Sequence, residues 1–475
     1  MYDYDLVVIG SGPAGEKAAT QAAYFGKRVA VIERDSRLGG ACINTGTLPS
    51  KTLRETALYL SGLQQRTLYG VSIEVRRDVS VPELMCRQGP VIGSQNDRIS
   101  WNLDRHKIPL LRGAGAFIDE HTIEITAHTG AVHRVTADAV LIATGTSPFR
   151  PPFVPWGDPE VDDSDTILRL PEMPKRLVIL GGGVIGCEYG SMFAALGCHV
   201  TIVEGRDAIL GFLDTEVNHL LSDQLRAIGI ELQLGRKVLE VARKNGLLHC
   251  MLDDGHDLVC ERLLFAGGRA GNTASLGLDK LGVEADARGL LKVDDHYALV
   301  GVKGGRVYAA GDVIGFPALA SVAMEQGRVA ACHAFDLHFK RSVAKLFPYG
   351  LYTIPEVSMV GETEESATQK GLSFEVGRAR YGDNARGQII GDTTGMVKLL
   401  FTIPDKKIIG VHVLGERATE LVHTGMAVMH YGGTLDDFIE MVFNFPTLGE
   451  LYKYAAYDGL GRLAHRAAFE AAPAP

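Results

Sequence analysis

The organisation of the chain is set by residues 6–15, Leu-Val-Val-Ile-Gly-Ser-Gly-Pro-Ala-Gly, an apolar run that stops at a glycine-rich turn. The alanine-rich residues 17–25 follow with helical spacing. A strand, glycine turn and helix in this order let the backbone approach a pyrophosphate at the amino end of the helix. A second apolar run, residues 28–32, ends at Glu33, whose carboxylate can accept hydrogen bonds from an adenosine ribose. The pattern therefore predicts a dinucleotide-binding fold.

The same pattern occurs a second time. Residues 176–180 are apolar and lead into Gly181-Gly182-Gly183-Val184-Ile185-Gly186, and a partner run at 200–203 ends at Glu204. Two complete dinucleotide folds imply two dinucleotides bound together. Glu204 suits the ribose of an NAD-type nucleotide, whereas Arg206 can pair with a 2′-phosphate or can be an ordinary solvated loop charge.

A third segment lies between the two patterns and covers residues 39–51, Gly-Gly-Ala-Cys-Ile-Asn-Thr-Gly-Thr-Leu-Pro-Ser-Lys. This segment has the glycines and the first cysteine, Cys42, of a redox-disulfide segment, but Thr47 stands where a second cysteine would complete the pair. Residues 53–63 have helical spacing, so Cys42, Thr47 and Lys51 are expected at or just before the start of a helix. Electrons that reach this segment must leave by a route other than a protein disulfide.

Composition excludes several classes of function. The 475 residues exceed the usual size of one hydrophobic core and predict two to four domains. A net charge of -9 argues against nucleic acid as a partner. The acidic amino terminus does not have the basic start of a signal peptide, and no apolar run approaches the roughly 20 residues that span a bilayer, so we expect no membrane association.

The seven cysteines are odd in number and scattered, which is typical of a reducing compartment and predicts a cytoplasmic protein. The 15 histidines form no close cluster with cysteine. We therefore expect no metal site.

Domain boundaries follow from breaks in these patterns. Five prolines between residues 148 and 159 forbid helix and interior strand, and residues 266–273 are a candidate return crossing. A strand at 306–310 then runs into Gly311-Asp312, and residues 321–335 are a predicted helix with Glu325, Gln326 and Arg328 on its polar side. The predicted units are residues 1–150 with 274–345, 151–273, 346–466, and a flexible tail at 467–475.

These ordered motifs resemble the flavoprotein disulfide reductases, the family of lipoamide dehydrogenase and glutathione reductase. The resemblance covers nearly the whole chain and ends in the Pro-Thr-x-x-Glu of residues 446–450. It implies an α/β protein with two Rossmann-like domains, the first for FAD and the second for NAD(P). It also implies a carboxyl-terminal α+β dimerisation domain that lends residues to the active site of a partner subunit.

The resemblance also implies site residues. Those for FAD are Gly10, Gly12, Gly15, Glu33, Arg34, Cys42, Lys51, Ala116, Thr144, Gly145, Gly311 and Asp312. Those for the nicotinamide nucleotide are Gly181, Gly183, Val184, Ile185, Gly186, Glu204, Arg206 and Gly268. Lys51 would lie near the flavin N5 and pair with Glu188, tuning the flavin without itself reacting.

Two departures from the family pattern bear on the reaction. Thr47 replaces the flavin-proximal cysteine, and Phe445 occupies the position before proline where disulfide reductases carry an acid/base histidine, although the orienting Glu450 is retained. Losses at two cooperating positions indicate a different electron acceptor. The pattern is similar to one branch of the family, the soluble si-specific pyridine nucleotide transhydrogenases, which also carry a lone cysteine.

The predicted reaction is hydride exchange between NADPH and NAD⁺ by a ping-pong route on bound FAD, with both nucleotides as substrates. The alternatives are an NAD(P)H:quinone or dye oxidoreductase on the same scaffold, a lipoamide dehydrogenase-like protein, and a flavoprotein without activity. The resemblance alone predicts a homodimer, with a larger homo-oligomer as an alternative.

Overall fold

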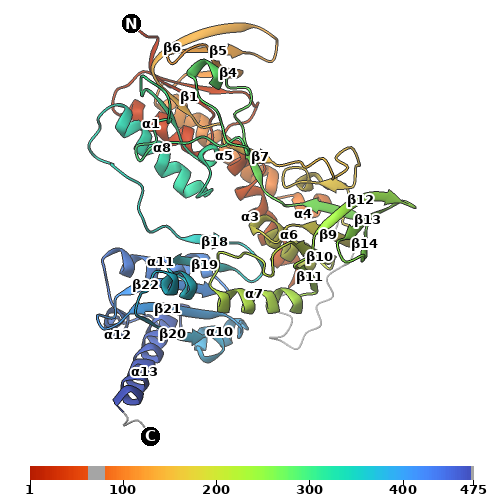
Figure 1. Cartoon of the computed structure of the whole chain (residues 1–475), viewed down its shortest axis with the longest axis vertical. Helices are drawn as coiled ribbons and strands as arrows, with labels where there is room; N and C mark the ends of the chain where they lie inside the picture. The colour runs from red at the N-terminus through yellow and green to blue at the C-terminus, as the bar shows by residue number, and fades with distance from the viewer. Residues whose placement is uncertain (63–80, 472–475) are drawn as a thin grey trace.

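The computed structural model describes residues 1–62 and 81–471, which form two Rossmann-like dinucleotide folds and a third, carboxyl-terminal domain. In Figure 1 the first fold lies at the top, the second at the right and the third domain, in blue, at the bottom. The first fold is built from two separate stretches of chain, since the green second fold interrupts it.

The first fold is a mixed sheet in the order β3-β2-β1-β6-β5-β4, with β17 paired to the free side of β6 near its end. The strands β3, β2, β1, β6 and β17 are parallel, whereas β4 and β5 extend the other half of the long β6 in antiparallel fashion. The strands are β1 (Tyr4–Ile9), β2 (Val29–Glu33), β3 (Leu110–Arg112), β4 (Ala114–Phe117), β5 (Thr122–Thr126), β6 (Val132–Ile142) and β17 (Val307–Ala309). Its helices are α1 (Pro13–Tyr24), α2 (Gly40–Asn44), α3 (Thr47–Ser61), α4 (Val81–Met85), α5 (Gln88–Arg105) and α8 (Ala320–Ala334).

Strand β1 is buried on both faces because its alternate side chains enter two different cores. Leu6 and Val8 pack with helices α1 and α8, whereas Val7 and Ile9 pack with β4 and β5. The helices α1 and α8 approach so closely that a Cβ on Gly327 would lie 2.1 Å from the carbonyl oxygen of Ala14. The switch in strand order lies between β1 and β6, where α/β folds bind their ligands.

The second fold repeats this plan on a parallel sheet in the order β11-β10-β9-β15-β8. An antiparallel three-stranded sheet, β12-β13-β14, packs beside it. The elements are β8 (Val161–Asp162), η1 (Ile167–Arg169), β9 (Arg176–Leu180), α6 (Val184–Ala195), β10 (His199–Glu204), α7 (Thr215–Ala227), β11 (Ile230–Leu234), β12 (Val238–Lys244), β13 (Leu247–Leu252), β14 (Asp257–Cys260) and β15 (Arg262–Phe265).

The chain enters and leaves the second fold through a two-stranded antiparallel ribbon, β7 (Thr146–Pro148) with β16 (Arg269–Gly271). The proline-rich exit and the Gly-Arg-x-Gly return predicted from the sequence therefore lie side by side. Two short helical turns, η2 (Leu278–Leu281) and η3 (Asp312–Ile314), flank the return to the first sheet.

The third domain is an antiparallel sheet in the order β18-β19-β22-β21-β20, with α11 and α13 packed against it. Its strands are β18 (Tyr349–Leu351), β19 (Val357–Gly361), β20 (Phe374–Arg380), β21 (Met396–Thr402) and β22 (Ile408–Leu414). Its helices are α9 (Glu364–Gln369), η4 (Tyr381–Asp383), α10 (Ala385–Ile390), α11 (Ala418–His430), α12 (Leu435–Glu440), η5 (Leu448–Glu450) and α13 (Leu451–Ala471).

The predicted fold class, two dinucleotide folds and an α+β domain, is confirmed. One local expectation is wrong. Gln326 is buried rather than on the polar side of α8, because its Oε1 accepts a 2.8 Å hydrogen bond from the Gly311 amide. Helix α13 runs to Ala471, and residues 472–475 of the predicted tail lie outside the described part of the chain. The exact domain boundaries are still predictions.

Among the described helices, none has both the length and the apolar character that crossing a bilayer requires.

Candidate active site

A cavity of about 1940 Å³ lies where the two folds and the third domain meet. The first fold lines it with the glycine turn after β1 and with the 40–51 segment, and the second fold lines it with the start of α6. The third domain contributes β18 and part of β19. Most of the predicted FAD residues lie on the wall of this one cavity.

The glycine turn after β1 is shaped by backbone contacts. Gly10 has a φ of 107°, and a Cβ there would lie 2.4 Å from the carbonyl oxygen of Ala143, the residue after β6. A Cβ on Gly15 would lie 2.0 Å from the Gly10 oxygen, whereas one on Gly12 would meet nothing within 4 Å. Gly12 precedes α1 without a capping side chain, so the first amide groups of the helix face open space. This end of the cavity suits a phosphate.

Glu33 is buried and holds this turn in place. Its Oε2 accepts hydrogen bonds from the Ser11 amide at 2.9 Å and the Ser11 hydroxyl at 2.6 Å, and its Oε1 accepts one from the Asp35 amide at 2.9 Å. The carboxylate therefore lies at the cavity wall with its orientation already set. Arg34 also lines the cavity, and its guanidinium lies 3.9 Å from the Asp35 carboxylate.

The second glycine turn repeats this geometry. Gly181 has a φ of 115° and its Cβ would lie 2.7 Å from the oxygen of Ala266, while a Cβ on Gly183 would meet nothing within 4 Å. Glu204 accepts hydrogen bonds from the Gly182 amide at 2.8 Å and from the Arg206 amide at 3.0 Å. Glu204 is thus the counterpart of Glu33, with the same two backbone bonds.

The two folds differ at the second residue after the glutamate. Asp35 follows Glu33 in the first fold, whereas Arg206 follows Glu204 in the second. The Arg206 guanidinium pairs with both oxygens of Glu204, at 2.9 Å and 3.1 Å. Burial alone would raise the pKa of Glu204, but the bonds from Arg206 and Gly182 hold it below its usual value. Because 62% of the Arg206 side chain is exposed, the guanidinium neutralises the acid while still facing solvent.

Lys51 and Glu188 connect the two folds, as the resemblance implied. Lys51 Nζ lies 2.6 Å from Glu188 Oε2, and Glu188 Oε1 accepts a 2.9 Å hydrogen bond from the Tyr352 amide of the third domain. The Tyr352 ring lies below the same ammonium, 5.0 Å from Nζ to the ring centroid. All three parts of the molecule meet at this ion pair.

The 39–51 segment contains one cysteine, Cys42, and all seven cysteines are free thiols in this structure. Cys42 belongs to α2, and Thr47 begins α3. Helix α3 therefore starts before residue 53, its predicted start, and includes Lys51, while residue 63 of the predicted helix lies outside the described part of the chain. Burial raises the pKa of Cys42, and a hydrogen bond with the Thr47 side chain only partly opposes this effect. The thiol is therefore held in its protonated, weakly nucleophilic form.

At the far wall, Asp312 follows Gly311 and accepts a 3.3 Å hydrogen bond from the Thr146 hydroxyl. Burial raises the pKa of Asp312, although Arg269 opposes the shift. Thr144 and Gly145 line the same wall, and the Thr144 hydroxyl is buried without a partner.

The open glycine turn, the uncapped helix and the orphaned Thr144 hydroxyl fit a large phosphate-bearing cofactor. Glu33, Lys51, Thr144 and Asp312 are the side chains that would hold FAD.

Not every predicted residue lies on the cavity wall. Ala116 does not line it, although its neighbours Gly113, Ala114 and Gly115 do. Val184 and Ile185 line the cavity, whereas Gly15, Gly181, Gly183, Gly186, Glu204, Arg206 and Gly268 lie outside it. Tyr349, Tyr352 and Arg269 also line the cavity. No sequence motif predicts this placement, because each lies far along the chain from the motif it faces.

Phe445 is not part of this cavity. Its side chain is 76% exposed, and Glu450 is used locally, where its carboxylate accepts a hydrogen bond from the Thr447 amide at 3.4 Å. Within one chain the Phe445 ring and Glu450 carboxylate are therefore away from Lys51 and Cys42.

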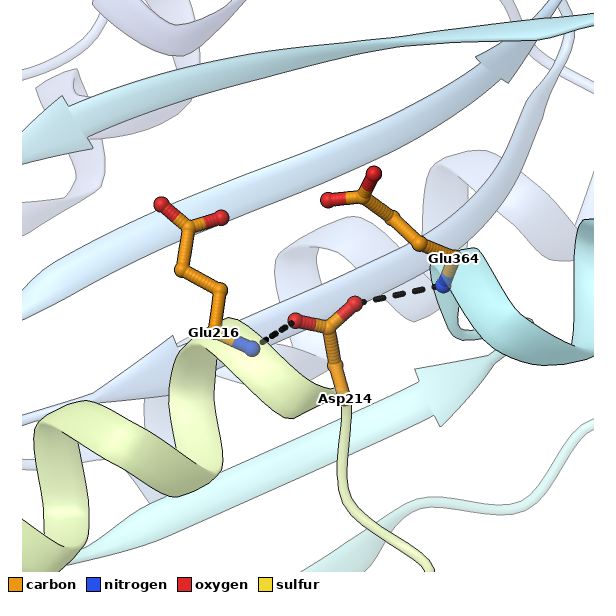
Figure 2. A group of neighbouring side chains, drawn as sticks. All are labelled: Asp214, Glu216 and Glu364. Atoms are coloured by element: carbon orange, nitrogen blue, oxygen red, sulfur yellow. Dashed lines mark hydrogen bonds between the residues drawn. The ribbon is translucent and has the colours of Figure 1, made fainter.

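Three carboxylates, from Asp214, Glu216 and Glu364, converge between the second fold and the third domain, as Figure 2 shows. Their separation would suit a metal ion, but the ammonium of Lys398 lies among them. Its Nζ is 2.7 Å from Asp214 and 2.9 Å from Glu216, and it also bonds Glu364. This group, the Lys398 cluster, is an interdomain ion network in which the lysine ammonium occupies the position that a metal ion would take.

Comparisons with known proteins agree with this geometry. The model of the pyridine nucleotide-disulphide oxidoreductase family matches residues 4–327, and that of its dimerisation domain matches residues 347–456. Among solved structures, the HOCl-induced flavoprotein disulfide reductase RclA from Escherichia coli superposes with a TM-score of 0.85 at 27% identity, over 96% of this chain and 99% of that one. LpdA from Mycobacterium tuberculosis superposes with a TM-score of 0.87 at 27% identity, over 95% and 99%.

Three curated relatives carry the name soluble pyridine nucleotide transhydrogenase. The protein from Mycobacterium tuberculosis is 46% identical over 98% of both chains. The protein from Colwellia psychrerythraea is 40% identical over 97% of this chain and 99% of its own, and that from Pseudomonas aeruginosa is 39% identical over 98% and 99%.

Proposed function

The chain belongs to the pyridine nucleotide-disulphide oxidoreductase family, and on this basis we propose that it exchanges a hydride between NADPH and NAD⁺ with FAD as bound cofactor. Its relatives at 39% to 46% identity bear the name of that activity. The observation that carries the proposal is the Lys51–Glu188 pair beside a lone thiol: the cavity retains the ion pair but has Thr47 opposite Cys42.

The residues of the second fold bind the nucleotide substrate. The glycine turn and the uncapped start of α6 offer amide groups to its pyrophosphate, and Glu204 faces its adenosine ribose. The fold has one such turn, so NADPH and NAD⁺ occupy it in succession, as a ping-pong route requires.

Dual use of one site needs a ribose subsite that accepts both a hydroxyl and a phosphate. Glu204 alone would repel a 2′-phosphate, but Arg206 already neutralises it. The exposed guanidinium is free to turn from the carboxylate to a phosphate, and it can return to Glu204 when the nucleotide has a 2′-hydroxyl.

The residues at the centre of the cavity set charge and exclude water. The chemistry that bound FAD supplies is two-electron storage between the two halves of the exchange. Lys51 places one positive charge at the junction of the folds, and Glu188 with the Tyr352 ring holds that ammonium in position. The protonated Cys42 thiol does not compete for electrons.

A second candidate is reduction of quinones or dyes. Phe316 is exposed on the cavity wall and stacks on Tyr349, with ring centroids 6.2 Å apart and an interplanar angle of 25°. This surface offers a flat contact for an aromatic oxidant.

One experiment separates these functions. Holoenzyme is treated anaerobically with one equivalent of NADPH and then mixed with NAD⁺ or with a soluble quinone. Rapid appearance of NADH supports transhydrogenation, and recovery of oxidised flavin only with quinone supports the second candidate. Failure of NADPH to reduce the flavin would contradict both.

We also propose that the protein works as a homodimer in the cytoplasm. Val442, Phe445, Tyr454 and Tyr457 expose aromatic and aliphatic surface on the third domain, which matches the family's dimerisation domain. Seven free thiols suit a reducing compartment that holds both nucleotide pools. Light scattering of the purified protein tests the assembly, and cell fractionation tests the location.

A further inference from the structure

Three residues that line the same cavity each have a buried hydroxyl group without a hydrogen-bond partner. The three hydroxyl groups belong to Thr144 after β6, Tyr189 on α6 and Tyr349 on β18, so each part of the molecule contributes one. Among the described residues only five buried side-chain polar atoms have no partner. Three of the five are therefore concentrated at one site, which indicates that their partner comes from outside the chain.

Tyr189 is the most constrained of the three. Only 3% of the residue is exposed, and its ring stacks on the buried Phe193 with centroids 6.4 Å apart and an interplanar angle of 25°. The hydroxyl cannot swing out to water without breaking this packing. A buried hydroxyl without a partner destabilises the folded chain, so a ligand acceptor would remove the penalty.

The charges around Tyr189 make its hydroxyl a donor. Burial, reinforced by the carboxylates of Glu188 and Asp165, raises the pKa of Tyr189, while the Arg269 guanidinium acts in the opposite sense. The hydroxyl therefore keeps its proton across the physiological range. Glu188 and Tyr189 are neighbours on α6, so this donor is adjacent to the Lys51–Glu188 pair.

We propose that the Tyr189 hydroxyl donates a hydrogen bond to a neutral carbonyl on the redox ring of a ligand in this cavity. The inference rests on the proposed function, which places such rings there. Two ligands offer this chemistry, the carboxamide of a nicotinamide nucleotide and the ring carbonyls of a flavin. A neutral donor suits both oxidation states of either ring, because it adds no fixed charge.

The test compares two Tyr→Phe variants with opposite expectations. Tyr189→Phe keeps the stacked ring and removes only the unpartnered hydroxyl. Tyr452→Phe is the matched control, because Tyr452 is also fully buried and stacked, on Phe438, but its hydroxyl donates to the Leu421 oxygen at 2.7 Å in the core of the third domain.

Nucleotide affinity is measured by fluorescence titration of each holoenzyme with NADH and with NADPH, and flavin retention by the flavin-to-protein ratio after dialysis against bromide. Tyr189→Phe should weaken the affinity for both nucleotides about tenfold, the equivalent of one neutral hydrogen bond, or should lower flavin retention. The first result assigns the acceptor to the nicotinamide carboxamide and the second to the flavin. Where the acceptor is the nicotinamide carboxamide, the melting temperature of the nucleotide-free holoenzyme should be unchanged or higher; where it is the flavin, a lower melting temperature should accompany the lower flavin retention.

Tyr452→Phe should show the reverse, a lower melting temperature with unchanged affinity and flavin retention. The inference is overturned if Tyr189→Phe binds both ligands as wild type does, or if it merely loses stability as the control does. A wild-type holoenzyme that binds neither nucleotide would instead overturn the proposed function itself.

Discussion

Lys51 Nζ and Glu188 Oε2 lie 2.6 Å apart although they belong to different folds, one on α3 and the other on α6. Glu188 is nearly buried, and its second oxygen is taken by the Tyr352 amide. The pair is thus a fixed junction whose geometry depends on all three parts of the molecule being docked.

Glu188→Gln should slow NADPH-to-NAD⁺ transfer by about 10- to 100-fold, because it removes the carboxylate charge that balances the Lys51 ammonium. Stopped-flow measurement of both half-reactions checks this, together with the absorption spectrum of the bound flavin. Glu55→Gln is the matched control: Glu55 also pairs with a cation on α3, Arg54, but its side chain is 66% exposed, so its loss should leave both half-reactions unchanged. Equal rates in wild type and Glu188→Gln would remove the role of the pair.

Thr47→Cys should place a second sulfur beside Cys42 and allow a disulfide, because the Thr47 side chain already bonds the Cys42 thiol. The variant should nevertheless turn over neither lipoamide nor glutathione disulfide, since Phe445 cannot move a proton. Thiol alkylation followed by mass spectrometry detects the bond, and steady-state assays test turnover. Thr47→Ser, which keeps the hydroxyl, should retain transhydrogenation. Robust disulfide reduction by the single variant would contradict this mechanism.

Arg206→Ala should raise KM for NADPH by about 10- to 100-fold and leave KM for NADH nearly unchanged, because it removes a charge-assisted phosphate partner. It also exposes an unneutralised Glu204. Arg236→Ala is the control, since Arg236 lies on the neighbouring loop and is paired with Asp254 at 3.0 Å. If Arg206→Ala affects both nucleotides equally, Arg206 is an ordinary surface charge.

Lys398→Met should lower the free energy of unfolding by about 3–5 kcal/mol at pH 7, because it leaves the buried Asp214 carboxylate without its cation. Lys398 is 0% exposed, whereas Lys406, paired with Asp436, is partly exposed, so Lys406→Met should cost about 1 kcal/mol or less. Denaturant titration gives both values.

The pH dependence separates lost charge from lost packing. Burial opposes ionisation of Asp214 and Glu216. His412 and Lys398 nevertheless hold the pKa of Asp214 below its usual value. Lys398 and Arg378 do the same for the pKa of Glu216. In wild type this stabilisation is present above the unfolded values of 3.8 and 4.5 and is lost as the pH falls below them. Without Lys398 the crowded carboxylates bind protons more readily, so the deficit of Lys398→Met should shrink between pH 7 and pH 5. A deficit that is the same at both pH values would indicate lost packing alone.

The sequence predicts local structure well wherever a motif is contiguous. Both glycine turns and their acids, Glu33 and Glu204, lie where the spacing predicts, because strand, turn and helix are consecutive in the chain. Thr47 likewise lies at a helix start.

Contacts between distant segments could not be predicted in this way. Tyr352 reaches Glu188 across 164 residues, and no local pattern marks the partner of its amide. Gln326 has the polarity of a surface residue, but the close approach of α1 and α8 turns it inward to the Gly311 amide. The ion pair between Arg206 and Glu204 could not be predicted either, because the spacing of the two residues does not fix where the Arg206 side chain points.

The return of the chain to β17 has a consequence for biosynthesis. Val307 pairs with Val140, so the first sheet cannot receive its last parallel strand until the ribosome has made the whole second fold. Asp312 follows that strand, so the part of the first fold made before the second fold waits, with one side of β6 unpaired at residues 140–142, until β17 has been synthesised. The proposed FAD site, which includes Asp312, is therefore completed late in synthesis, and the unpaired edge of β6 is open to wrong pairing until then.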